Sequence, residues 1–517
     1  MRLARRHPRA APPWIAAIAT AIGVLLLVPL VGVLVEALGT DSRTVRRVLS
    51  GPLLPTLLIH TVELTAVVSI GCSVLGLGSA WLVERTDLPF RRLFAVLLVA
   101  PLAVPEFVAS YSWVSLAPSV QGLWGASLVM TLSLYPLVFL PVAASLRRSD
   151  PAVDEVARSL GVGSVRRFCT ITLPSVSRAL VGGTLLIGLY MLGEYGAFAL
   201  LRYRTFATAI YTQYKTLDSN TASALTLVLC LIGVVLLMGE SRVGRRGQAL
   251  RESGRPAARS SLGRATPAAV IGVVALCVLG IGVPIGSIVH WMARGSSTTL
   301  PPASVVSTTI ESLKLGGIAA LIATLLAVPV AVMAVRHRSR LSSTIERSAY
   351  LDRALPGIAI GLTLVTVAVH HFRSLYQTTT MLEIAYVILF FPLALVSVRS
   401  AVARVPVSLD DVARALGASP FRVLRRVILP LVLPGLAAAA TLVWLSATTE
   451  LTATLLLRPT GLKTLATQFW VYTTGLAYGA AAPYAAIMIA TSMVPVLLLF
   501  RLGRASAGRT KRSEAFR

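Results

Sequence analysis

Twelve apolar runs, each about long enough to cross a bilayer as a helix, constrain this chain more than any other feature. Of its 517 residues, 55% are hydrophobic and 13% are charged, which excludes a disordered chain and an ordinary soluble enzyme. A membrane helix needs about 20 apolar residues, so the sequence predicts an all-α, polytopic membrane protein with about 12 transmembrane helices. The runs lie near 14–35, 57–83, 93–117, 123–146, 179–201, 222–239, 267–290, 310–335, 354–371, 381–403, 435–457 and 480–501.

The positive charge is distributed as expected for a membrane protein. A formal net charge of +27 could suggest nucleic-acid binding, but the basic residues form short clusters between apolar runs instead of one basic domain. With twelve spans and a cytoplasmic N-terminus, segments on the cytoplasmic side carry 37 Lys and Arg residues, and external loops carry 10. Because positive residues stay on the cytoplasmic side, this excess predicts that both termini are cytoplasmic.

The chain contains an internal repeat. Residues 154–174 and 410–430 are identical at 9 of 21 positions with an offset of 256 residues. An even number of spans per copy places both copies the same way up, so we expect two tandem parallel repeats of six helices. The predicted organisation is a first half at 1–239, a cytoplasmic linker at 240–266 and a second half at 267–517.

A basic loop between the fourth and fifth spans of each half is the most informative segment, at 147–178 and 404–434. Each copy predicts a short helix that stops at a glycine, Gly161 or Gly417, followed by a second short helix that ends before a proline. An apolar stripe with charged neighbours suits docking against a soluble protein. An amphipathic loop lying on the bilayer surface is the alternative interpretation.

These loops resemble the EAA motif of ATP-binding-cassette importer permeases, which reads Glu-Ala-Ala, three residues, Gly, nine residues, Ile-x-Leu-Pro. The first copy supplies Glu155, Ala157, Gly161, Ile171, Leu173 and Pro174, and the second supplies Asp411, Ala413, Gly417, Val427, Leu429 and Pro430. Val156 and Val412 stand where the motif has its first alanine. In the second copy, Asp411 replaces the glutamate and Val427 replaces the isoleucine. The resemblance covers essentially the whole chain as two fused permease halves.

Several expectations follow from this resemblance. The partners would be a cytoplasmic ATPase dimer and an extracytoplasmic solute-binding protein, with the chain lying among the lipids of a bacterial plasma membrane. The residues that contact the ATPase would be Asp154, Glu155, Ala157, Gly161, Asp410, Asp411, Ala413 and Gly417.

The segment after the fifth span resembles the fused permeases of ferric-iron importers. It reads Gly193-Glu194-Tyr195-Gly196-Ala197, with Thr205-Phe206-Ala207-Thr208-Ala209-Ile210-Tyr211 a few residues later. Permeases for thiamine and aminoethylphosphonate share similar segments. The resemblance therefore implies ferric iron as the cargo, with those two solutes as alternatives.

No enzymatic chemistry is predicted for this chain. It has no GxxxxGK[ST] motif, so ATP must be hydrolysed by a separate subunit. The histidines form no HExxH pattern, and the dipeptide His370-His371 is better explained as an interfacial polar pair than as a metal site. We therefore expect no catalytic residues, no metal site and no cofactor.

Six glutamates lie in or near the apolar runs: Glu63, Glu106, Glu194, Glu311, Glu383 and Glu450. A charged side chain in hydrocarbon costs at least about 2.5–3.5 kcal/mol, so each should face the bundle interior or a wet cavity. Glu311 and Lys314 are spaced to neutralise one another. Glu194 and Glu450 are related by the 256-residue offset, which makes them the candidates for the translocation path, although tying helices together would explain them equally well.

A secondary transporter, driven by ion coupling through these carboxylates, is the alternative of a different class. Parallel repeats do not separate it from an ATP-driven importer. The duplicated loop does favour the importer, because a secondary carrier has no ATPase to engage.

Overall fold

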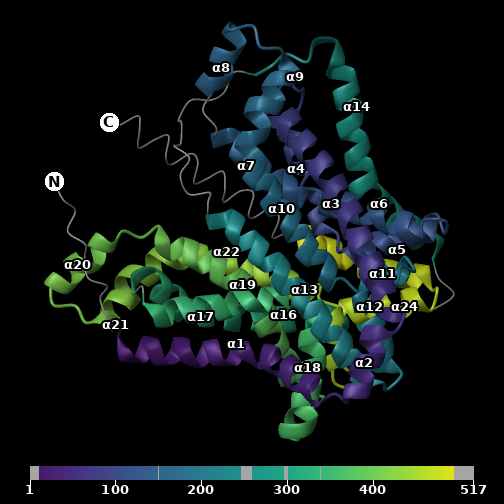
Figure 1. The fold of residues 1–517 in the computed structure, drawn as a ribbon, viewed down its shortest axis with the longest axis vertical. Coiled ribbons are helices and arrows are strands. Elements are labelled where there is room, and N and C mark those ends of the chain that lie inside the picture. Colours follow the sequence, from purple (N-terminus) through teal and green to yellow (C-terminus); the bar gives the residue numbers. More distant parts are fainter. Residues whose placement is uncertain (1–10, 149–150, 246–258, 296–300, 338, 494–517) are drawn as a thin grey trace. The chain divides into compact units, whose positions relative to one another are not determined.

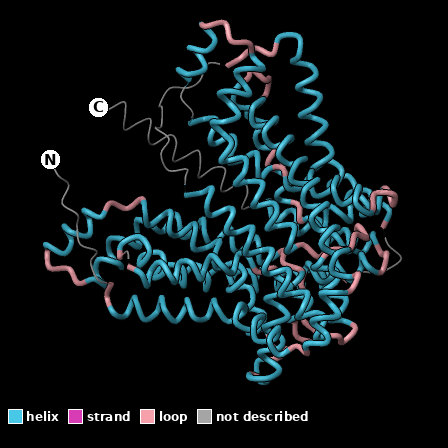
Figure 2. Tube along the Cα trace, viewed as in Figure 1, coloured by secondary structure: helices cyan, strands magenta, loops and turns pink. Residues whose placement is uncertain are grey.

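The computed structural model describes residues 11–148, 151–245, 259–295, 301–337 and 339–493. Helices make up most of this part of the chain (Figure 2), and its β-structure is one isolated parallel bridge between Thr86 and Ser260. In the described residues, 9 helices are long and apolar enough to cross a membrane, or up to 11 spans if each of two bent helix pairs counts as one. The predicted all-α, polytopic class is confirmed.

The nine straight spans match nine of the predicted runs. They are Pro13–Gly39, Leu53–Arg85, Gly122–Arg147, Phe168–Gly193, Ser219–Glu240, Gly263–Arg294, Pro302–Arg336, Thr379–Ala403 and Phe421–Thr448. The last predicted run, 480–501, is helical as far as residue 493, and the remainder lies outside the described residues.

The third span of each half is broken at a proline. In the first half, α4 (Arg91–Leu97) and η1 (Ala100–Ala103) meet α5 (Glu106–Leu116) at a bend of 91°. In the second half, α17 (Arg340–Leu351) and η5 (Asp352–Ala354) meet α18 (Gly357–His371) at 105°. Val104 and Leu355 have extended backbones, as expected for residues that precede a proline, here Pro105 and Pro356.

Helix packing divides the chain into two compact units. Of the described residues, those at 11–39 and 301–468 belong to unit 1, and those at 40–295 and 469–493 belong to unit 2. The division falls within α24 (Leu465–Thr474).

In unit 1, α16 (Pro302–Arg336), α19 (Thr379–Ala403) and α22 (Leu429–Thr448) pack against one another. α1 (Pro13–Gly39) lies along α16, α17 and α18 (Figure 1). Small residues permit the close approach of these helices: a Cβ atom on Gly435 of α22 would collide with the side chain of Ala401 on α19.

In unit 2, α3 (Leu53–Arg85) packs against α7 (Pro136–Arg148) and α10 (Leu173–Gly193), and α10 packs against α13 (Ser219–Arg245). α15 (Val283–Arg294) packs against α5. A Cβ atom on Gly76 of α3 would lie 2.7 Å from the Cβ of Val138 on α7, so glycine is needed at this crossing. Unit 2 also contains α6 (Gly122–Leu134), α12 (Phe206–Lys215), α14 (Thr266–Cys277) and the helical residues 478–493.

The compact units differ from the halves predicted at 1–239 and 267–517. Each unit contains the first helix of the other sequence half: α1 packs in unit 1, and α14 and α15 pack in unit 2. The predicted halves describe a duplication in the sequence, whereas the units describe which helices pack together.

Part of the predicted linker, 240–266, is described. α13 continues to Arg245, and residues 246–258 lie outside the described part of the chain. The Ser260 N–H donates to the Arg85 carbonyl (2.9 Å), and the Leu262 N–H donates to Asp87 Oδ1 (2.8 Å). These contacts attach the end of the linker to the cytoplasmic end predicted for α3.

Candidate functional site

The duplicated loop has the same structure in both repeats. α8 (Pro151–Ser159) and α9 (Ser164–Arg167) correspond, at an offset of 256 residues, to α20 (Val407–Ala415) and α21 (Pro420–Val423). One turn of π-helix follows in each copy, η2 (Phe168–Thr172) and η7 (Leu424–Ile428). Pro174 and Pro430 lack the N–H that would continue a regular helix, which accounts for a widened turn before them.

A glycine ends the first helix of each loop, as predicted. Gly161 and Gly417 have positive φ values of +73° and +79°. In the first copy the Val162 N–H donates to the Ala157 carbonyl and the Gly161 N–H donates to the Arg158 carbonyl, both at 3.0 Å. This is a Schellman motif, which requires a left-handed residue at the glycine position.

The second copy has the counterpart of the bond from Val162: the Ala418 N–H donates to the Ala413 carbonyl at 3.0 Å. A Cβ atom on Gly161 or Gly417 would meet nothing within 4 Å. The glycines are therefore required for their backbone conformation and not for space.

The apolar stripe of each loop is exposed. Val156 and Leu160 are 57% and 76% exposed, and Val412 and Leu416 are 58% and 82% exposed. Ala157 is buried, and Ala413 packs partly against the hydrophobic core of unit 1. The backbones of the remaining predicted contact residues lie on α8 and α20, but their side chains lie outside the described part: Asp154, Glu155, Asp410 and Asp411.

The two glutamates predicted to line the path make local capping contacts. Glu194 Oε1 accepts a hydrogen bond from the Ala197 N–H (2.7 Å) at the start of α11 (Gly196–Leu200). Glu450 lies at the matching place before α23 (Thr452–Leu457). It accepts from the Ala453 N–H (3.0 Å), the Thr454 N–H (3.2 Å) and the Thr454 hydroxyl (3.0 Å). A carboxylate suits this place because the first N–H groups of a helix have no partner within the helix.

Glu450 also lies beside the broken third span. Its Oε1 is 3.4 Å from the position that a Cβ on Gly357 would occupy, at the first residue of α18. In the first half the residue after the breaking proline is Glu106 itself, whose Oε2 accepts from the Tyr190 hydroxyl (3.1 Å). Both breaks therefore have a carboxyl group nearby, supplied by different elements.

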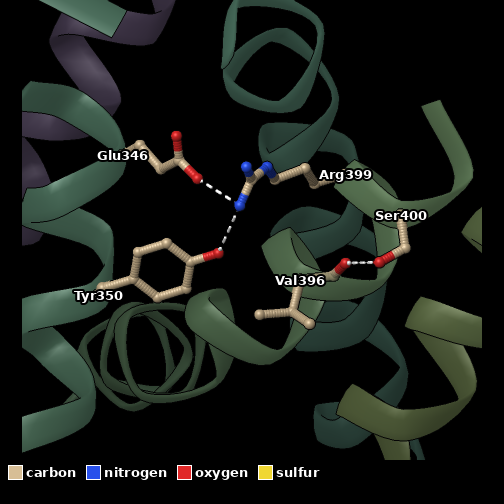
Figure 3. A network of polar contacts seen from close by, with 5 residues as sticks. All are labelled: Glu346, Tyr350, Val396, Arg399 and Ser400. Atoms are coloured by element: carbon tan, nitrogen blue, oxygen red, sulfur yellow. Dashed lines mark hydrogen bonds and ion pairs between the residues drawn. The ribbon is translucent and has the colours of Figure 1, made fainter. Parts of the chain in front are cut away.

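Ion pairs lie on and between membrane helices of unit 1. Lys314 Nζ lies 3.8 Å from Glu311 Oε2, which confirms the predicted pairing. On α19, Arg399 Nη1 contacts Glu346 Oε1 (2.6 Å) and donates to the Tyr350 hydroxyl (3.4 Å), which ties α17 to α19 (Figure 3).

Glu383 on α19 differs from the other intramembrane glutamates. It is 9% exposed, and neither carboxyl oxygen has a hydrogen-bond partner in the described part of the chain. Sequence reasoning placed it among the acidic residues but did not select it, because the 256-residue offset favoured Glu194 and Glu450. The repeat position of Glu383 is Ser127. Within the described residues, no three His, Cys, Asp or Glu side chains form a group that could hold a metal ion.

Comparison with known proteins identifies the family. Residues 72–246 and 319–512 match the family described as "Binding-protein-dependent transport system inner membrane component". The chain belongs to this family and contains two copies of its domain in tandem, which confirms the predicted repeat.

Relatives of known function belong to the same class. The chain is 36% identical over 501 residues to an Fe(3+)-transport system permease protein of Haemophilus influenzae, covering 95% of this chain and 99% of the relative. It is 28% identical over 249 residues to a sulfate transport system permease protein of Escherichia coli, covering 43% of this chain and 90% of the relative. A molybdenum transport system permease protein of Escherichia coli is 29% identical over 187 residues, covering 32% and 80%. This protein is thus a multi-pass transport permease and not an enzyme.

Proposed function

We propose that this protein is the membrane subunit of an ATP-driven importer whose cargo is ferric iron. Ferric iron is proposed as the cargo because of the similarity to the Haemophilus influenzae Fe(3+)-transport permease. This similarity extends over nearly the full length of both chains. The similarity to the sulfate and molybdenum permeases covers less than half of this chain.

The duplicated loops are the proposed contacts with an ATPase dimer. Each loop presents an exposed apolar stripe on a short helix whose end is fixed by Gly161 or Gly417. One chain with two such loops can engage two ATPase subunits, one per loop. Acidic residues at 154–155 and 410–411 lie on the same helices and belong to the proposed contact.

The other proposed partner is an external solute-binding protein, and both termini are proposed to lie in the cytoplasm of a bacterial cell. Support for this orientation comes from the excess of Lys and Arg in the segments assigned to the cytoplasm. A single cysteine in place of exposed Gly163 should react with a membrane-impermeant reagent only from inside. One in place of Phe372, which is 55% exposed, should react only from outside. Cys169 is exposed and must first be replaced by serine, and labelling of both positions from one side would refute this orientation.

During transport, ATP binding and hydrolysis would move the loops and shift the membrane helices between inward-facing and outward-facing states. We assign Glu194 and Glu450 to the path, where they hold α11 and α23 in position through the hydrogen bonds described above. Cation attraction by the same carboxylates is compatible with these bonds, since each group has further lone pairs.

Reconstitution tests this proposal. Proteoliposomes that contain this chain, its ATPase and an iron-loaded binding protein should accumulate labelled ferric iron only when ATP is supplied. Uptake of thiamine or a phosphonate in place of iron would refute the cargo. Uptake driven by an ion gradient without the ATPase would refute the ATP-driven class and support the secondary transporter.

A further inference from the structure

Glu383 is a buried carboxyl group that the packing of unit 1 leaves unsatisfied. It lies in the first turns of α19, is 9% exposed, and neither Oε1 nor Oε2 has a hydrogen-bond partner among the described residues. Buried polar groups nearly always have such partners, and an ionised carboxylate in an apolar interior is especially costly without them. An unsatisfied carboxyl at this place calls for a ligand that the protein itself does not supply.

Oxygen-bearing side chains on α19 itself and at the start of α23 form a hydrogen-bonded chain next to this part of the helix. Tyr386 lies one turn further along α19, and its hydroxyl is 2.6 Å from Thr454 Oγ1, which in turn contacts Glu450. Glu383 and Tyr386 are three residues apart on α19 and therefore share a face of that helix, and Thr454 links the Tyr386 hydroxyl to Glu450.

The neighbouring cation is already paired. The charge of Lys314 acts on Glu383, but its ammonium group lies 3.8 Å from Glu311 Oε2. A cation bound at Glu383 would supply the contacts that its carboxyl group lacks.

The first repeat does not reproduce this arrangement. At the offset of 256 residues, Glu383 corresponds to Ser127, Tyr386 to Met130 and Thr454 to Phe198. Only Glu450 has an acidic counterpart, Glu194. The arrangement therefore belongs to the second repeat alone, unlike the loops, which are duplicated.

We propose that Glu383, with Tyr386 and Glu450, forms a transient binding site for a hard, oxygen-preferring cation within unit 1. Carboxylate and phenol oxygens suit such cations. Two carboxyl groups and one phenol are too few ligands for a permanent metal cage, which suits a step on a transport path, where the ion must also leave. The identification of that cation as ferric iron rests on the proposed function.

Cation binding can be measured without transport. The probe is terbium(III), a hard trivalent ion whose emission is sensitised by nearby tyrosine, added to the assembled transporter in lipid nanodiscs. Glu383→Gln keeps the shape and removes the charge, so it should weaken terbium binding about tenfold or more in a transporter that still assembles with its ATPase. Unchanged binding in an assembled Glu383→Gln variant overturns the site.

Two matched variants leave Glu383 in place and test whether a cation binds there, even if Glu383→Gln fails to assemble. Lys314→Gln removes the nearby positive charge and should tighten terbium binding about tenfold at most. Glu311→Gln releases Lys314 to pair with Glu383 and should weaken binding. Affinities equal to that of the unaltered protein in both variants overturn the site.

The outcomes also separate this site from the proposed cargo. Terbium binding that depends on Glu383, in a transporter that does not import ferric iron, would refute the cargo and keep the site. Import of ferric iron at an unchanged rate by Glu383→Gln, with unchanged terbium binding, would refute the site and keep the cargo.

Discussion

The two repeats are alike in their loops and different inside the membrane. Both loops have two short helices, a left-handed glycine and a turn of π-helix at matching positions. In the interior, Glu383 and Tyr386 of the second repeat correspond to Ser127 and Met130 of the first. This difference fits the proposed roles. Docking onto an ATPase dimer would use both loops, whereas a single path would need only one cation site.

The largest effect is expected from the feature that the repeats share. A double Gly161→Val, Gly417→Val variant places β-branched residues at positive φ, which costs about 1–2 kcal/mol at each loop and misplaces both helix ends. ATP-dependent uptake should fall about tenfold or more, with normal membrane insertion. The double Gly161→Asn, Gly417→Asn variant is the matched control, because asparagine tolerates this conformation, and it should retain most activity. Unchanged uptake by the valine variant would contradict the coupling role of these helix ends.

Variants of Glu450 test whether its hydrogen bonds to the start of α23 stabilise the protein. Glu450→Ala removes the acceptor of three hydrogen bonds and should lower stability by about 1–3 kcal/mol. Glu450→Gln keeps an acceptor oxygen and should lower it by less, which thermal unfolding of the purified protein will show. If the glutamine variant is as unstable as the alanine variant, the negative charge, and not the hydrogen bonding, stabilises this turn.

Variants of Arg399 and Tyr350 test the polar contacts between α17, in the broken third span of the second repeat, and α19. Arg399→Met removes the partner of Glu346, whose side chain is 19% exposed, and should destabilise the protein by about 1 kcal/mol after allowance for the partial exposure of Arg399. Tyr350→Phe removes only the longer 3.4 Å contact and should have less effect. Equal unfolding temperatures for Arg399→Met and the unaltered protein would show that packing alone holds α17 on α19.

The smallest effect is expected at the linker, and it depends on pH. The hydrogen bond from the Leu262 N–H lowers the pKa of Asp87 below its usual value, and Ser261 contributes in the same direction. Because the pKa is lower in the folded state, the stabilisation is present above the unfolded value of about 3.9 and is lost as the pH falls through the folded value. Amide exchange at Ser260–Leu262, corrected for the intrinsic rate, should therefore rise in acid. Asp87→Asn should remove this dependence, and identical profiles for the two proteins would contradict it.

Sequence patterns predicted the helices, the repeat and the loop glycines, because apolar length and left-handed backbone are local properties. Position within the repeat also located the capping glutamates Glu194 and Glu450. It passed over Glu383, whose carboxyl group has no hydrogen-bond partner among the described residues, because this property depends on how α19 packs against α16 and α23. The placement of α1 with helices of the second half is likewise a result of packing that no local pattern encodes.

The number of ATPase subunits bound by one permease chain tests most directly whether the duplicated loops act as two equivalent docking sites. The transporter should be purified in its assembled form and weighed by native mass spectrometry. We predict a complex of one copy of this chain with two ATPase subunits, reduced to one ATPase when only Gly161 or only Gly417 is replaced by valine. A complex that contains two copies of this chain, or one that binds a single ATPase in the unaltered protein, would contradict the account.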